Sequence, residues 1–190
     1  MATRLLALFL SISVAAAAAA FAQPQAVAPY AGFERREIAS LSASDLAEIR
    51  AGQGWGLALP AELNGVPGPV HLLELATEIG LADAQIAALA GLRDRMRNAA
   101  IEAGAAFIAA EQALGAAFVD GPPDAAALAL RVAAAETARA KLRLAHLAAH
   151  LETLPLLSQE QIAAYKRLRG YAGEHDGSRA SPERHMHRRH

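Results

Sequence analysis

The stretch "AAFVDGPPDAAAL", residues 116–128, decides the fold. It places one glycine and two prolines between two long runs rich in alanine, leucine, glutamate and arginine, which are strong helix formers. Gly121 is suited to end one helix, and Asp124 is suited to cap the next. Because the connection is short, the stretch predicts two long antiparallel helices, over about residues 83–119 and 124–153.

The spacing of apolar residues supports two helices that pack on each other. Apolar residues recur in steps of three and four in both runs, and nothing alternates with the period of a strand. The sequence therefore predicts an all-α fold built on a long antiparallel helical hairpin. The two predicted packing rows are Leu89, Leu92, Met96, Ala99, Ala103, Phe107, Leu114 and Phe118 in the first helix, and Leu144, Leu147, Leu151 and Leu154 in the second.

Before the hairpin, residues 23–69 predict an extended arm that contains one short helix. The helix is "LSASDLAEIRA", residues 41–51, in which Ser42 caps the start and Asp45 follows three residues later. The next 18 residues hold five glycines and three prolines, and there Trp55 and Leu57 are the expected anchors.

A second short helix is predicted directly before the hairpin. It runs from His71 to Ile79, with Pro69 in its first turn and Gly80 at its end. It opens the helical domain, which is predicted over residues 70–171.

The two ends of the chain are predicted to lie outside the fold. Residues 1–22 have one charge, Arg4, then an apolar run and the small residues Ala20 and Ala22, which is typical of a cleaved signal peptide. Export to the periplasm or outside the cell is expected, with an uncleaved membrane anchor as the alternative, and a chain without cysteine must then be held by its core, a partner chain or a metal. Residues 172–190 have no apolar pattern and predict a disordered, histidine-rich tail.

Composition excludes several classes of function. The chain has 18 basic and 19 acidic residues, which gives no electrostatic case for binding nucleic acid. No second apolar run is long enough to span a bilayer, so no stable membrane insertion is expected after signal cleavage. Without cysteine, and without the G-x-S-x-G or H-E-x-x-H patterns, the sequence predicts a protein that is not an enzyme.

Two segments start helices with a shared outline. "LSQEQI", residues 157–162, has a serine cap with a glutamine three residues later, and "LADAQI", residues 81–86, repeats the outline with Ala82 in place of the cap. Two such L-[ST]-x-x-Q-like segments around a helical hairpin, behind an export signal, resemble the Spy/CpxP family of periplasmic stress proteins. The resemblance covers about residues 71–171.

The resemblance implies a small all-helical fold, usually a dimer with a curved, cradle-like shape. It also implies work in envelope stress. Members of the family include ATP-independent chaperones, inhibitors of stress-sensing kinases, zinc-binding resistance proteins and nickel or cobalt sensors.

The histidines carry the metal hypothesis. In "AHLAAHLE", residues 145–152, His146 and His150 lie one helical turn apart on one face, a spacing that lets two imidazoles reach one ion. The helix that starts at His71 is expected to fold back near this pair, with Glu74 or Glu78 as an oxygen ligand. The alternative is that both histidines are polar residues at the edge of the packed face.

The family resemblance bears on the same residues. In its metal-sensing branch, His146 matches a histidine on a later helix, His150 occupies a further ligand position four residues on, and His71 is a looser match. Imidazole and carboxylate ligands suit zinc, nickel, cobalt or copper(II). In the tail, His185, His187 and His190 form a second, flexible metal-capturing motif, with a solvated tail as the alternative.

Three functions are compatible with these features. The first is a periplasmic envelope-stress protein that binds or senses a divalent metal, and the second is an ATP-independent holding chaperone without metal dependence. The third is a regulatory module that binds an envelope stress sensor through residues 52–69. For the chaperone, unfolded clients would meet a dimer face rimmed by Arg93, Arg95, Arg97, Arg139, Lys141 and Arg143.

Overall fold

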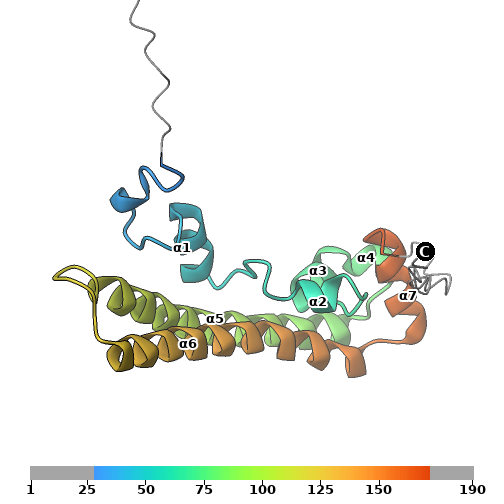
Figure 1. The fold of residues 1–190 in the computed structure, drawn as a ribbon. Helices are drawn as coiled ribbons and strands as arrows, with labels where there is room; N and C mark the ends of the chain where they lie inside the picture. The colour runs from blue at the N-terminus through green and yellow to red at the C-terminus, as the bar shows by residue number, and fades with distance from the viewer. Residues whose placement is uncertain (1–27, 172–190) are drawn as a thin grey trace, which may run out of the picture. The chain divides into compact units, whose positions relative to one another are not determined.

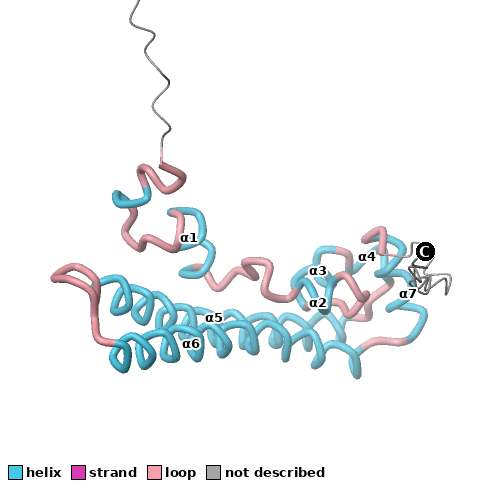
Figure 2. The backbone as a smooth tube through the Cα atoms, viewed as in Figure 1, coloured by secondary structure: helices cyan, strands magenta, loops and turns pink. Residues whose placement is uncertain are grey.

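The computed structural model describes residues 28–171, and these residues form helices and connecting loops without a strand (Figures 1 and 2). The predicted all-α class is thus confirmed for this part of the chain. The predicted signal peptide and histidine-rich tail lie outside it. The helices are η1 (Phe33–Arg35), α1 (Ala43–Arg50), α2 (Leu59–Glu62), α3 (Pro69–Glu74), α4 (Ala76–Ile79), α5 (Asp83–Ala116), α6 (Ala125–Thr153), η2 (Leu154–Leu156) and α7 (Gln159–Leu168).

Residues 28–31 form a turn that belongs to a separate unit from the chain beginning at Gly32. Among the described residues, no helix combines the length and the apolar character that crossing a membrane requires.

Helices α5 and α6 lie side by side along their length (Figure 1). Arg95 pairs with Glu152 at one end, and Arg131 donates to the carbonyl of Ala113 towards the other, so the two helices run antiparallel. Asp124 caps α6 by accepting hydrogen bonds from two backbone N–H groups at 2.9 Å. The chain turns between them over residues 117–124.

The face that α6 buries differs from the predicted one. Leu144 and Leu151 are 64% and 63% exposed, whereas the buried row runs through Leu142, His146, Ala149 and His150. The prediction was wrong because α6 has two apolar stripes, and the larger side chains marked the outer one. The inner stripe is rich in alanine, which lets α5 approach closely.

The row that α5 buries is also shifted in its middle. Ala100 and Gly104 are buried, whereas Ala99 is exposed and Ala103 is half-buried. Gly104 meets Ile49 of α1, and a Cβ atom at this position would lie 2.7 Å from the Ile49 side chain. Helix α1 and the residues around it therefore pack directly on α5 and belong to the core.

Helix α1 begins as predicted. Ser42 Oγ accepts a hydrogen bond of 3.1 Å from the Asp45 N–H, and the Asp45 carboxylate accepts one of 2.7 Å from the Ser42 N–H. The two expected anchors of the next segment are in place, since Leu57 is buried and the Trp55 ring packs on Phe107.

The predicted helix over residues 71–79 is divided in two. Leu75 leaves the helical conformation at φ −106°, so α3 ends at Glu74 and α4 begins at Ala76. Gly80, at φ 71°, ends α4. The break lets the chain turn towards the start of α5.

The two similar helix starts bind each other. Gln85 and Gln161 each accept the N–H of their own cap residue, and their amides exchange hydrogen bonds of 2.8 and 3.0 Å. The second amide hydrogens reach equivalent carbonyls, those of Leu156 and Gly80. The starts of α5 and α7 are thereby joined by a nearly symmetrical set of bonds.

Replacing either glutamine of this pair with alanine should lower the free energy of unfolding by about 1–2 kcal/mol, because the remaining amide loses a half-buried partner. Since the two residues share these bonds, the loss in the Gln85→Ala/Gln161→Ala variant should be about 1 kcal/mol smaller than the sum of the single losses. Urea unfolding measures all three. Gln112→Ala, at an exposed position of α5, is the control. Additive losses would contradict the pairing.

Candidate functional site

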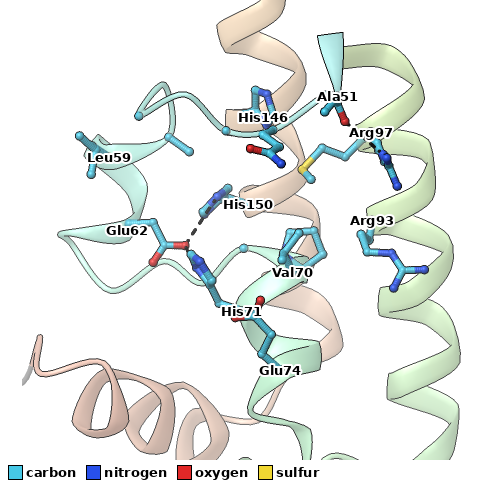
Figure 3. Close-up of a pocket in the computed structure, with 18 residues that line it drawn as sticks. Ala51, Leu59, Glu62, Val70, His71, Glu74, Arg93, Arg97, His146 and His150 are labelled. Carbon is cyan, nitrogen blue, oxygen red and sulfur yellow. Dashed lines mark hydrogen bonds and ion pairs between the residues drawn. The ribbon is translucent and has the colours of Figure 1, made fainter. Parts of the chain in front are cut away.

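A cleft of about 690 Å³ lies between the segment over residues 51–74 and the long helices (Figure 3). The segment supplies one wall, and α5 and α6 supply the other. Its titratable lining residues are Glu62, His71, Glu74, Arg93, Arg97, His146 and His150.

Glu62 is the centre of a buried polar cluster beside this cleft. Its Oε1 atom lies 2.9 Å from His71 Nδ1 and 3.9 Å from His150 Nε2. Its Oε2 atom accepts a hydrogen bond of 2.5 Å from the hydroxyl of Tyr165 on α7. Glu62 is only 7% exposed, so this carboxylate is surrounded by protein groups from three different helices.

A loop with close backbone approaches brings Glu62 to the histidines. Gly65 has φ 69°, and a Cβ atom there would collide with the Lys166 side chain. At Gly68 a Cβ atom would lie 2.6 Å from His150 Nε2. The loop is fastened to α6 because Thr153 Oγ1 donates to the carbonyl of Pro67 at 2.7 Å.

The hydrogen bonds fix where the protons lie. His150 Nδ1 is 2.9 Å from the carbonyl of Val66, which only accepts, so this nitrogen carries a proton and Nε2 faces Glu62. His71 Nδ1 likewise donates to the Glu62 carboxylate. In neutral His150, therefore, a lone pair on Nε2 is directed towards a carboxylate oxygen, an arrangement that leaves a place for a cation between them.

Glu62 is held as a carboxylate. Burial alone would raise the pKa of Glu62, but the hydrogen bonds from His71 and Tyr165 outweigh it, and the pKa is lowered. Burial, followed by the hydrogen bond to Glu62, raises the pKa of Tyr165, so its hydroxyl stays protonated as the donor.

His146 lies one turn from His150 on α6, but its ring does not join the Glu62 cluster (Figure 3). It is 2% exposed, and its Nε2 atom has no hydrogen-bond partner. Burial and the neighbouring His150 lower the pKa of His146, against a smaller opposite effect of the Gln53 backbone. His146 is thus a neutral imidazole with one unused nitrogen in the wall of the cleft.

The structure brings together only part of the predicted metal set. His71 and His150 meet as expected, but they meet at Glu62, while Glu74 is exposed at the rim of the cleft and Glu78 is exposed on α4. Nothing in the spacing of residues marks Glu62 or Tyr165, because they are 103 positions apart. The tail histidines His185, His187 and His190 lie outside the described residues.

In residues 28–171 no three or more histidine, aspartate or glutamate side chains are already arranged as a metal site. Instead, His71 Nδ1 and Glu62 Oε1 are joined by a hydrogen bond of 2.9 Å. What the cluster offers is two imidazole nitrogens and one carboxylate oxygen that converge, with a third imidazole one turn away.

Comparison with known protein families, curated proteins and solved structures finds no match to this chain. The resemblance to the Spy/CpxP family therefore depends on the two glutamine segments and the helical pattern alone.

Replacing Glu62 with alanine should lower the free energy of unfolding at pH 7 by about 2–4 kcal/mol, since the Tyr165 hydroxyl then loses a charged partner in a buried place. Glu74→Ala removes an exposed carboxylate of the same cleft and should change stability by less than about 0.5 kcal/mol. Chemical unfolding monitored by circular dichroism measures both.

The stability difference between the wild type and Glu62→Ala should depend on pH. Because folding lowers the pKa of Glu62, its stabilising contribution is complete above the unfolded pKa, about 4.3, and is lost as the pH falls through the lower folded value. The stability difference between the wild type and Glu62→Ala should therefore shrink in acid. A difference that persists well below pH 3 would contradict the role of the charge.

Proposed function

We propose that this protein binds a divalent transition-metal ion at the Glu62 cluster, as a metal-responsive protein of the cell envelope. The convergence of His71 Nδ1 and His150 Nε2 on one oxygen of buried Glu62 is the observation that carries the proposal. Imidazole–imidazole–carboxylate sets suit zinc, nickel, cobalt or copper(II).

The distances of the cluster are close to those of a ligand set. Ligands about 2.0–2.1 Å from a tetrahedral zinc ion lie about 3.3 Å apart. The two nitrogens lie 2.9 and 3.9 Å from Glu62 Oε1, one slightly nearer and one slightly farther than this spacing. Entry of an ion would replace the proton on His71 Nδ1, and each of these two nitrogen–oxygen separations would change by about half an ångström.

The surroundings of His150 support the proposal. Metal-ligating histidines donate their second ring N–H to a carbonyl or carboxylate, which orients the ring, and His150 makes such a bond to Val66. Gly68 lies against the Nε2 end of the same ring, which a Cβ atom there would approach to 2.6 Å. The cleft gives the site an opening for a further ligand.

The cellular setting follows from the sequence. The predicted signal peptide places the protein in the periplasm, and the Spy/CpxP resemblance connects it with envelope stress. A metal ion would also join the segment over residues 59–71 to α6, which suits a chain that has no disulfide to hold such a segment.

The outer stripe of α6 favours a homodimer as the working form. From Leu130 to Leu154 it advances in alternate steps of three and four, the spacing of a coiled-coil seam. Leu130, Leu144 and Leu151 are 73%, 64% and 63% exposed, and packing the same stripe of a second copy would bury them. The full stripe is Leu130, Ala133, Thr137, Ala140, Leu144, Leu147, Leu151 and Leu154.

The chaperone alternative has less support from side-chain positions. Of the basic residues expected to rim a client-binding face, Arg93 and Arg97 line the cleft, while Arg95 pairs with Glu152. Residues 52–69, expected to recognise a stress sensor, form a wall of the cleft. Both roles remain second to metal binding in this proposal.

Calorimetric titration of Zn²⁺, Ni²⁺, Co²⁺ and Cu²⁺ tests the proposal. The chain lacking its signal peptide, with His175, His185, His187 and His190 changed to alanine, should bind one ion with a Kd of about 1 μM or below. His71→Ala, His150→Ala and Glu62→Gln should each weaken binding by at least about tenfold, because each removes one ligand.

Glu74→Ala is the matched control and should bind as the unsubstituted chain does. His146→Ala reports the number of protein ligands. A tenfold loss of metal affinity would mean that His146 is also a ligand. An unchanged Kd would mean that solvent or a ligand from the cleft occupies the fourth position. Failure of all four metals to bind the chain that retains the cluster would refute the proposal.

Disrupting the outer stripe should abolish the dimer. Leu144→Glu and Leu151→Glu place charges in the seam, so sedimentation equilibrium should show monomers where the wild type is dimeric. Leu63→Glu, at a similarly exposed leucine next to α2, is the control and should leave the dimer intact. Equal masses for all variants would contradict the assignment of the seam.

A further inference from the structure

Tyr165 connects the proposed metal site to the C-terminal helix. It is fully buried, and its hydroxyl donates to Glu62 Oε2, the carboxylate oxygen that faces away from His71 and His150. Its ring packs in a cluster with Leu72 and Leu89, so it is held on all sides. A single carboxylate therefore joins the histidines on one side to α7 on the other.

We propose that Tyr165 is the positioning residue of the metal site, and that occupancy of the site is coupled through Glu62 to the docking of α7. This inference rests on the proposed function. Hydrogen-bond partners of ligating carboxylates orient them for the ion, and their removal weakens metal binding 10–100-fold.

The remaining contacts of α7 make it suited to such coupling. Gln161 joins its first turn to Gln85, and the Lys166 stem packs against Gly65 on the loop that follows Glu62. Apart from Tyr165, most side chains of α7 are exposed or half-buried. A helix of ten residues attached this way opens more readily than α5 or α6. An added constraint at Glu62 would therefore change how often α7 opens.

Coupling of this kind acts in both directions. If docked α7 raises the affinity of the site for the ion, then the bound ion must stabilise docked α7 by the same factor. The output of the site would be the docking of α7.

The first test is zinc titration of Tyr165→Phe, in the chain whose tail histidines are changed to alanine. The phenylalanine retains the ring and loses only the hydroxyl, and we expect zinc affinity to fall 10–100-fold. Tyr171→Phe is the matched control, because Tyr171 lies beside the Tyr165 ring and contacts Arg169, and its affinity should not change.

The second test is amide hydrogen exchange. If Tyr165 had only a structural role, zinc would not change the exchange rates of α7. Zinc should slow exchange in α7 of the unsubstituted chain at least tenfold, leave α1 unchanged, and lose its effect on α7 in Tyr165→Phe. Circular dichroism verifies that the variant is folded.

The outcomes separate the two proposals. Zinc binding that is equally tight in the unsubstituted chain and in Tyr165→Phe overturns the positioning role but leaves the metal site intact. Equal exchange of α7 with and without zinc overturns the coupling, whatever the variant does. Absence of zinc binding to the unsubstituted chain refutes the metal site, and the coupling with it.

Discussion

Pairing the buried carboxylate of Glu62 is the constraint on which this end of the structure depends. A carboxylate removed from water is costly unless several donors surround it. Here the donors come from α3 and α7, with His150 of α6 in reach, so four segments are fixed relative to one another around two oxygen atoms. The glycines and prolines of residues 65–69 allow the backbone to come close enough for this arrangement.

The alanine-rich helices leave room for that cluster. Ala149 of α6 packs with Leu92 and Met96 of α5, so a small residue on the inner face of α6 suffices there. The inner face of α6 can therefore hold two histidines, while Leu144 and Leu151 lie on the outer face. Both apolar stripes of α6 need a packing partner, which is why we propose a second copy of the chain as the partner of the outer stripe.

The sequence was most informative where structure is decided locally. The caps at Ser42, Asp124 and Ser158 act within three residues of themselves, so the starts of three helices could be predicted from their own residues. The buried face of α6 could not, because 3.6-residue periodicity is satisfied equally by either stripe, and only packing against α5 chooses between them.

Only part of the candidate site could be predicted from the sequence. His150 and His71 could be proposed because imidazole is a metal ligand at any position. Glu62 could not, because it sits in a four-residue helix inside a segment whose path is set by contacts with α6 and α7, far away in sequence. The expected glutamates, Glu74 and Glu78, follow from helical spacing after His71, whereas the actual neighbour, Glu62, comes from the preceding helix α2.

The cluster places a buried ionic group where apolar side chains could also pack, and that choice is an argument for a ligand. Apolar side chains of similar volume in place of a buried ionic group often leave a protein equally or more stable. Local rules that are broken without a structural gain tend to mark functional sites. Here the unpaired His146 nitrogen, the His150 Nε2 atom 3.9 Å from a buried carboxylate oxygen and the open cleft beside them are three such departures in one place. A cation would resolve the second of them directly, because it could bind both His150 Nε2 and the carboxylate.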